Sequence, residues 1–388
     1  MIEDYIEAFN KAKRPVILAG WGVRASDAID QFKAFIDKVN VPVLLTWKGI
    51  DILADEHPCY CGRPGSIGQR AANIIQQKSD FLLILGCRLD PDQVGFDYHN
   101  FAPNARKVAV DIDVHEANKY PAGFAQFLVY DIKDFLKDDS EYKRHDGKWL
   151  SWCKELNKKY PACLPEHLEG NDTNLYKLAD ELSKQCTADD VLAIGSSGPS
   201  ANIILQTWKV KDGQRFIYAP ALGAMGSDIP MSIGACLASG KRRTICVTGD
   251  GGFQLNAQEL EVIRRENLPI KIFIASNHGY GSIAMMQDKY FKHRVGADEA
   301  SGFTIPSVDD VSRAYGIPCF YIKRKYNLHK MIKMVFDFTA PCVIEVETPL
   351  LQAQTPRIRS EMINGQITPF PMEDMYPELP ELKELMNA

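Results

Sequence analysis

Residues 244–286 read TICVTGDGGFQLNAQELEVIRRENLPIKIFIASNHGYGSIAMM, and their pattern is the most informative one about the fold. The apolar run 244–248 has the length of a buried strand and passes directly into Gly249-Asp250-Gly251-Gly252. A helical pattern over 256–266 follows, and a second apolar run over 270–275 ends in Ser276-Asn277-His278-Gly279. A strand, a helix and a second strand in this order are typical of a unit with parallel strands.

Both glycine-rich turns follow strands, and ligands of open parallel sheets bind at that edge. The glycines let backbone N–H groups approach an anion closely. Asp250 among such amides indicates a divalent cation, because proteins hold Mg²⁺ with one or two oxygens, phosphate oxygens and water. The amide oxygen of Asn277 and the carbonyl of Gly279 return to the same edge and can complete an oxygen shell. Either segment alone could be an ordinary tight turn, and only their joint spacing favours a site.

The same alternation of strands and helices extends outward from this stretch to about residue 349. Strand-length apolar runs lie at 15–19, 41–46, 81–86, 107–112 and 127–130, and again at 191–195, 216–219, 244–248, 270–275 and 342–347. A polar stretch at 137–148 separates the two series and is interpreted as a linker. We therefore expect an α/β fold with two doubly wound parallel-sheet domains, at 1–145 and 146–350. The irregular tail, 351–388, is expected to pack on the body or on a neighbouring chain.

Length and composition exclude several classes of protein. The 388 residues are enough for two or three domains, and 45% hydrophobic with 24% charged residues is typical of a globular chain. No apolar run approaches the roughly 18 residues of a membrane helix. The 45 basic and 50 acidic residues give a net charge of −5 without long blocks, which argues against nucleic acid and membrane partners. The acidic start after Met1 is unlike a secretory signal, so we expect a cytoplasmic protein that binds small molecules.

The ten cysteines form no CxxC pair, which argues against a disulfide scaffold or a zinc ribbon. His57, Cys59 and Cys61 do cluster, but they lack a second ligand pair, so a simple loop is favoured over a metal site. Neither half contains the GxGxxG fingerprint followed by an acidic residue, which disfavours an NAD-dependent dehydrogenase.

Several segments together resemble the thiamin-diphosphate-dependent enzymes of the acetolactate synthase-like family. GDG at 249–251, followed by Ser276-Asn277, is similar to the cofactor fingerprint of that family. ALGAMG at 221–226 resembles its GLGAMG segment. Further similar segments of the family's middle domain are RPVILAGWGV at 14–23, GCRLD at 86–90, NFAPNA at 100–105 and VDID at 110–113.

The resemblance implies thiamin diphosphate and Mg²⁺ as cofactors. It makes Asp250, Asn277 and the carbonyl of Gly279 the Mg²⁺ ligands. Met225 would be the wedge that bends the cofactor, since an unbranched, polarisable side chain fits between two rings, and the Gly223 carbonyl would accept from the aminopyrimidine. The diphosphate would be held by the Gly251 and Gly252 amides and by the turn at 196–198. The expected cofactor-binding residues are Ser196, Ser197, Gly198, Gly223, Ala224, Met225, Asp250, Gly251, Gly252, Asn277, Gly279, Tyr280 and Gly281.

The activity that the resemblance implies is decarboxylation of a 2-keto acid such as pyruvate, with transfer of the remaining unit to an acceptor carbonyl. In this family a glutamate on a pyrimidine-binding domain activates the cofactor. The sequence begins where the middle domain begins, so no catalytic residue is assigned, and a homo-oligomer or a pyrimidine-domain partner chain is expected.

Two alternatives stay open. The chain could be a non-catalytic fragment or the cofactor-binding subunit of a split enzyme. Ser282 and Met286 stand where acetolactate synthases carry Met and Trp, and the tail contains Pro371-Met-Glu-Asp-Met-Tyr-Pro. In these features the chain resembles acetolactate synthase relatives of bacterial surface-sugar pathways. Those relatives join a two-carbon unit to a keto-sugar nucleotide.

Some family members hold FAD in the middle domain. Arg88 could pair with a flavin phosphate, or it could be an ordinary surface cation. The segments that fall where flavin contacts are expected are 20–22, 46–47, 66–68, 111–112, Gly86 and Arg88.

Overall fold

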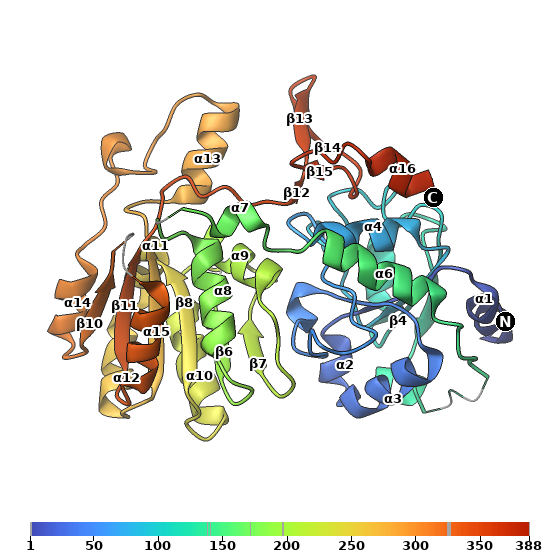
Figure 1. Cartoon of the computed structure of the whole chain (residues 1–388), viewed down its shortest axis with the longest axis horizontal. Coiled ribbons are helices and arrows are strands. Elements are labelled where there is room, and N and C mark those ends of the chain that lie inside the picture. Colours follow the sequence, from blue (N-terminus) through green and yellow to red (C-terminus); the bar gives the residue numbers. More distant parts are fainter. Residues whose placement is uncertain are drawn as a thin grey trace. The chain divides into compact units, whose positions relative to one another are not determined.

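The computed structural model describes residues 2–137, 139, 141–170, 172–195, 198–323 and 327–387. The chain divides into two compact units: unit 1 is Met1–Ala162 with Thr355–Ala388, and unit 2 is Cys163–Gln354 (Figure 1). Each unit is built around one parallel sheet with helices, so the predicted α/β fold class is confirmed. Among the described helices, none combines the length and the apolar character that a membrane span requires.

The sheet of unit 1 has the strand order β2-β1-β3-β4-β5, and all neighbours are parallel. β1 and β3 are buried along their whole length, as expected for strands with helices on both sides. The strands are β1 (Pro15–Ala19), β2 (Val43–Leu45), β3 (Phe81–Leu85), β4 (Arg106–Asp111) and β5 (Gln126–Val129). The helices are α1 (Ile2–Lys11), α2 (Gly22–Ala25), η1 (Trp47–Gly49), α3 (Ile29–Val39), α4 (Arg70–Lys78), η2 (Val114–Lys119), α5 (Ile132–Phe135) and α6 (Lys148–Lys159).

The polar stretch at 137–148 belongs to unit 1. Residues 138 and 140 lie outside the described part, but Tyr142 is buried and its ring centroid lies 5.3 Å from that of Phe9 and 4.9 Å from that of Phe35. Cys153 and Leu156 of α6 join the same hydrophobic core. The sequence predicts the first boundary after residue 145, whereas the compact units divide after residue 162. The difference arises because Tyr142 and α6 pack into the core of unit 1.

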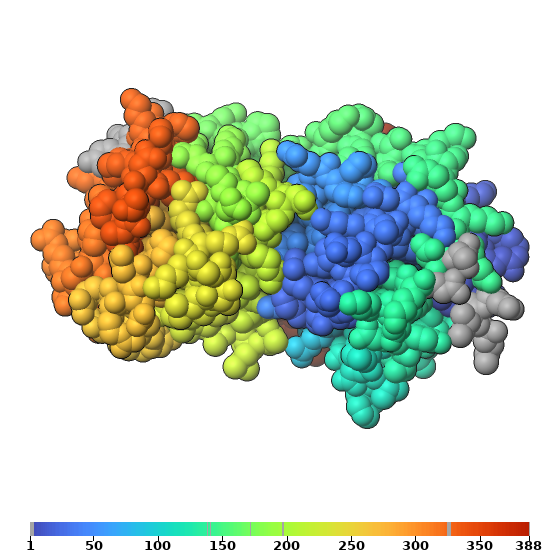
Figure 2. Space-filling view, turned by 90° about the horizontal axis from the view of Figure 1, so that it is seen from below, coloured from blue at the N-terminus to red at the C-terminus, as the bar shows by residue number. Residues whose placement is uncertain are grey.

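The tail also packs on unit 1, through the polar helix α4. The side chain of Asn73 donates from Nδ2 to the carbonyls of Gly65 (3.1 Å) and Met372 (2.8 Å). Lys78 donates to the carbonyls of Leu385 (2.7 Å) and Met386 (3.1 Å). Seen from below, the red tail is almost hidden behind the blue and blue-green residues of unit 1 (Figure 2). The tail contains β12 (Arg357–Ile358), β13 (Ser360–Ile363), β14 (Gln366–Pro369), β15 (Met375–Tyr376) and α16 (Leu382–Asn387).

Asn73→Ala is expected to lower the free energy of unfolding by about 2 kcal/mol. The carbonyls of Gly65 and Met372 and the amide of Gly65 would each lose their hydrogen bond to the Asn73 side chain. Asn73 is fully buried, and besides its two donor bonds its Oδ1 accepts from the Gly65 amide (2.9 Å). Urea unfolding followed by circular dichroism measures the change. Asn104→Ala, at an exposed position of the same unit, is the matched control and should stay within about 0.5 kcal/mol of wild type.

The sheet of unit 2 has the strand order β10-β11-β9-β8-β6-β7, again with parallel neighbours. Ile272 and Ile274 of β9 face the core formed with α10, α12 and α14, while Phe273 packs edge-on against Phe336 of α15, so helices cover both faces. The strands are β6 (Val191–Ile194), β7 (Arg215–Tyr218), β8 (Thr244–Gly249), β9 (Ile270–Ser276), β10 (Cys319–Ile322) and β11 (Cys342–Glu347). The helices are α7 (Pro165–Leu168), α8 (Leu175–Gln185), α9 (Pro199–Thr207), α10 (Asp228–Ala238), α11 (Asp250–Phe253), η3 (Gln254–Glu259), α12 (Leu260–Arg265), α13 (Gly281–Tyr290), η4 (Glu299–Ser301), α14 (Val308–Ala314) and α15 (Leu328–Asp337).

The strand order of unit 2 reverses between β6 and β8. The chain leaves β6 toward β7 on one side and leaves β8 toward β9 on the other. The two turns that follow these strands therefore diverge, and such a point is where open α/β sheets bind ligands. The same edge also receives the turn after β9, so three loops that are distant in sequence meet there.

Candidate functional site

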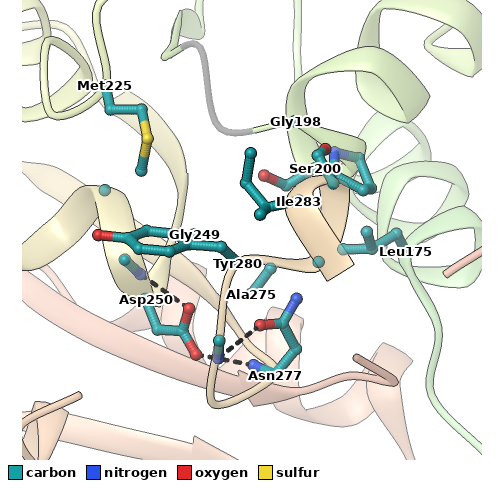
Figure 3. A pocket seen from close by; sticks show the side chains of 16 residues that line it. Leu175, Gly198, Ser200, Met225, Gly249, Asp250, Ala275, Asn277, Tyr280 and Ile283 are labelled. Atoms are coloured by element: carbon teal, nitrogen blue, oxygen red, sulfur yellow. Dashed lines mark hydrogen bonds between the residues drawn. The ribbon is translucent and has the colours of Figure 1, made fainter. Parts of the chain in front are cut away.

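A cavity of about 230 Å³ opens at this edge of the unit 2 sheet (Figure 3). Its walls come from the turns after β6, β8 and β9, from the start of α13 and from the loop that carries Met225. Asp250 is the only acidic residue among the described residues that line it. The lining residues are Leu175, Gly198, Pro199, Ser200, Met225, Gly249, Asp250, Gly251, Gly252, Ala275, Asn277, Gly279, Tyr280, Gly281, Ser282 and Ile283.

Asp250 is held by backbone amides at the floor of the cavity. Its Oδ1 accepts from the Gly251 amide (2.7 Å), and its Oδ2 accepts from the amides of Asn277 (2.9 Å) and His278 (2.6 Å). The residue is only 2% exposed, and this burial raises the pKa of the carboxyl group. The hydrogen bonds from the three backbone amides lower the pKa and partly offset the effect of burial. Such a buried carboxylate without a salt-bridge partner among the described residues suits a bound cation.

Asn277 and Gly279 lie in the turn that follows β9. The Oδ1 of Asn277 accepts from the Gly279 amide (3.1 Å), which folds the turn tightly beside Asp250 (Figure 3). A Cβ at Gly279 would collide with the carbonyl of Ala297, so glycine is required by close backbone approach. The structure thus brings together the three residues that the sequence nominates as metal ligands, and each carries an oxygen of the kind that Mg²⁺ prefers.

Tyr280 lies directly over Gly251. A Cβ at Gly251 would collide with Cε1 of the Tyr280 ring and would stand 2.9 Å from Cδ1. The ring cannot move away freely, because it stacks on Phe303 with 4.2 Å between the centroids. Gly281 begins α13, and a Cβ there would stand 2.7 Å from the carbonyl of Leu350. Glycine at 251 and 281 is therefore demanded by tertiary packing.

Met225 projects its thioether into the cavity from the opposite wall (Figure 3). It is 39% exposed and sits in a loop whose two glycines have positive φ, +64° at Gly223 and +78° at Gly226. The carbonyl of Ala224 accepts from the hydroxyl of Ser227 (2.9 Å). Gly223 and Ala224 themselves are exposed and are not among the lining residues.

The turn after β6 is only partly described. Ser196 and Ser197, which the sequence nominates for the diphosphate, lie outside the described residues. Gly198 lines the cavity with a φ of +54°, and a Cβ there would collide with the hydroxyl of Ser282. Gly252 also lines the cavity, whereas the Gly251 amide already donates to Asp250.

Several lining residues were missed by the sequence reasoning. Ser200 stands near the start of α9 and Ala275 near the end of β9, so their positions follow once the strand order is known. Ile283 follows from the direction of α13. Leu175 comes from the start of α8, and no local pattern points to it.

In the structure, Asp37 rather than Cys61 joins His57 and Cys59 in this cluster. Asp37 of α3 lies 3.3 Å from Nε2 of His57, and the candidate ligand atoms of Asp37, His57 and Cys59 all lie within 4.8 Å of one another. However, Nδ1 of His57 accepts from the Cys59 amide (3.2 Å), which leaves the ring proton on Nε2, facing Asp37. Burial raises the pKa of the Cys59 thiol to about 11. The His57 ring thus takes part in hydrogen-bonding contacts at this loop, and the simple-loop interpretation stays a prediction.

Several polar groups of the residues expected to contact a flavin already form hydrogen bonds within unit 1, and flavin binding stays a prediction. The amides of Gly22 and Gly86 donate to the carbonyls of Gly86 (3.0 Å) and Val110 (2.9 Å), and the Gly68 amide donates to Gly65 (3.0 Å). The hydroxyl of Ser66 donates to Asp92 (2.6 Å). These groups are not free to bind a diphosphate, since phosphate binding at glycine turns depends on free amides. By contrast, the indole N–H of Trp47 is buried and has no hydrogen-bond partner among the described residues. Arg88 is exposed.

Each of the two units contains a segment that matches a known protein-family model. Residues 2–138 match the family model described as thiamine pyrophosphate enzyme, central domain, and residues 196–346 match the model of the C-terminal TPP binding domain. The chain is 28% identical over 350 residues to the acetolactate synthase large subunit of Lactococcus lactis and 27% identical over 362 residues to a probable acetolactate synthase large subunit of Methanococcus aeolicus. Each alignment covers 89% of this chain and 59% of the relative, so the chain spans about three fifths of their length.

A third relative is similarly distant. The large subunit of acetolactate synthase isozyme 2 of Escherichia coli is 26% identical over 373 residues, which are 94% of this chain and 65% of that protein. The two matched models together cover most of the chain and fall on units 1 and 2 respectively.

Proposed function

The chain belongs to the acetolactate synthase-like enzymes that depend on thiamin diphosphate, and from this premise we propose that the cavity of unit 2 holds the diphosphate end of that cofactor together with Mg²⁺. The observation that carries the proposal is the buried Asp250 carboxylate, aligned by three amides beside Asn277 and Gly279. Asp250, the Asn277 side-chain oxygen and the Gly279 carbonyl would be the metal ligands. Phosphate oxygens and water would complete the shell.

The remaining nominated residues would hold the organic part of the cofactor. Gly198 and Gly252 leave room for the diphosphate because neither carries a side chain, and Ser196 and Ser197 are proposed to assist. Met225 would press on the cofactor from the opposite wall, with the Gly223 carbonyl as an acceptor. Tyr280, kept in place by Phe303, would wall the cavity between Met225 and Asp250 (Figure 3).

When bound, thiamin diphosphate would supply the carbanion chemistry that decarboxylates a 2-keto acid such as pyruvate and transfers the remainder to an acceptor. The chain's own residues would bind the metal and the diphosphate, orient the cofactor and keep water out. Apolar groups of Met225, Ile283 and Leu175 surround the cavity, which strengthens the electrostatic contacts inside it.

A partner surface is part of the proposal. Large apolar side chains stay exposed on and beside the loop that carries Met225: Leu222 of this loop is at 92% of its full accessibility, and Leu255, next to Gly226, is at 49%. Exposed apolar side chains of this size commonly mark an interface. We propose that a second copy of the chain, or a chain that carries a pyrimidine-binding domain, covers these exposed apolar side chains. Two residues that line the cavity, Met225 and Ile283, are also exposed, as is Met286 on α13.

A second candidate function is a cofactor-binding subunit that is inactive alone. It is favoured by the absence of any glutamate from the described lining of the cavity, because activation of the cofactor needs a carboxylic acid near its ring. In that case the chain would bind thiamin diphosphate and Mg²⁺ but would release no CO₂ without a partner.

One experiment tests both candidates. Purified protein with thiamin diphosphate and Mg²⁺ is assayed for release of ¹⁴CO₂ from carboxyl-labelled pyruvate, and cofactor binding is measured by isothermal titration on the same sample. Release of CO₂ together with Mg²⁺-dependent binding supports the enzyme acting alone. Binding without turnover supports the subunit, and absence of Mg²⁺-dependent binding contradicts both.

A further inference from the structure

The loop that carries Met225 is anchored mainly at its last residue. Residues 221–225 are all exposed, and Gly226 is the first buried residue after them. Met225 is nevertheless the side chain that closes one wall of the cavity. An exposed loop has few contacts that fix its position. The place of Met225 therefore depends strongly on what holds Gly226.

Asn256 holds Gly226. Its Nδ2 donates to the carbonyl of Gly226 (2.8 Å). Gly226 has a φ of +78°, and a Cβ there would stand 2.7 Å from Cβ of Leu255 and 3.1 Å from Nδ2 of Asn256. Glycine is thus needed both for the backbone conformation and for close approach to residues 255 and 256. The loop 221–226 therefore packs on residues 255 and 256, which follow the turn that carries Asp250.

Both polar atoms of the Asn256 side chain form hydrogen bonds. Its Oδ1 accepts from Nε2 of Gln258 (3.0 Å), while its Nδ2 donates to Gly226. The backbone of Asn256 (φ −138°, ψ 34°) is non-helical and interrupts the helical run that begins at Asp250. A propensity-driven helix would continue through this position, so the interruption points to a tertiary role for Asn256.

We infer that Asn256 is a positioning residue, which couples the Met225 loop to the segment that begins with Asp250. One short segment then supplies the proposed metal ligand at its start and the anchor of the opposite wall six residues later. The inference rests on the proposed function, because it assigns Asn256 a part in shaping the cavity for a ring-bearing cofactor. Asn256 itself is not among the residues that line the cavity.

The test compares two ligands, thiamin diphosphate and inorganic diphosphate, each titrated with Mg²⁺ into wild type and Asn256→Ala. Loss of one hydrogen bond predicts roughly 10-fold weaker binding of thiamin diphosphate, with inorganic diphosphate within about 2-fold of wild type. Asn256→Asp keeps the shape but cannot donate to Gly226, so it should show the same selective loss. Thermal unfolding of both variants checks that the fold persists.

A double-mutant cycle with Met225→Ala makes the test specific. If Asn256 acts through Met225, then Asn256→Ala should change the affinity for thiamin diphosphate by less than about 2-fold in the Met225→Ala background. Additive effects, an equal loss for inorganic diphosphate, or unchanged binding by Asn256→Ala would each overturn the inference while the proposed function stands. A wild type that binds thiamin diphosphate no better than inorganic diphosphate would overturn the proposed function and the inference with it.

Discussion

Asp250→Ala is expected to weaken Mg²⁺-dependent binding of thiamin diphosphate roughly 100-fold, which corresponds to about 2.7 kcal/mol. The substitution removes a metal ligand together with its charge, and no other acidic residue of the described lining can replace it. It also leaves the amides of Asn277 and His278 without their acceptor, so the turn after β9 should loosen. Isothermal titration at saturating Mg²⁺ measures the loss.

Two further variants isolate the role of the charge. Asp250→Asn keeps the shape and an acceptor for the amides, so loss of Mg²⁺ dependence in a folded Asp250→Asn protein would identify the charge as the cause. Asp310→Ala removes an exposed carboxylate from α14 of the same unit and should bind the cofactor like wild type. Unchanged affinity in both Asp250 variants would show that the metal lies elsewhere.

Gly251→Ala is expected to lower the affinity for thiamin diphosphate about 10-fold or more and to destabilise the protein by about 1–3 kcal/mol. The added methyl group would collide with the ring of Tyr280, which stacking on Phe303 holds in place. Either the ring or the GDGG turn must shift, and both form the cavity wall. Titration of the cofactor and thermal unfolding report the two effects separately.

The matched control is Gly234→Ala in helix α10. A Cβ at Gly234 meets no atom within 4 Å, so this change should leave binding unchanged and stabilise the helix by about 1 kcal/mol. Replacing Tyr280 with leucine in the Gly251→Ala background should restore part of the lost stability, because the smaller side chain gives way. A Gly251→Ala protein with the stability and affinity of wild type would refute the packing argument.

Most strands could be predicted from the sequence because they are buried on both faces. Strands β1 and β11 begin and end at the residues that bound the apolar runs 15–19 and 342–347. Strand β10, Cys319–Ile322, was missed. It lies at the edge of its sheet and exposes Tyr321, so its burial pattern is incomplete and its four residues follow a proline. The helix expected at 256–266 is instead η3 and α12, with the interruption at Asn256.

The candidate site could be located from the sequence because the strands on which it depends could be predicted. Turns after parallel strands meet at one sheet edge, and Asp250 and Asn277 follow two consecutive apolar runs, so the sequence predicts them at the same edge. The hydrogen bond from the Asn277 amide to Asp250 now joins them at 2.9 Å. Leu175 and Asn256 could not be found in this way, because their roles depend on contacts with segments that are distant in the chain.

The fold class was legible in the amino-acid sequence: two α/β units with parallel strands. So were the two turns of the site, the glycine-rich turn with Asp250 and the turn with Asn277 after the next strand. Periodicity and glycine spacing are local properties, and they are legible without coordinates. Three features became visible only in the folded chain: the polar helix α4 is buried, the Tyr280 ring leaves no room for a Cβ at Gly251, and Asn256 donates to the Gly226 carbonyl beside Met225. These features arise from long-range packing and hydrogen bonding, whose partners no local pattern specifies.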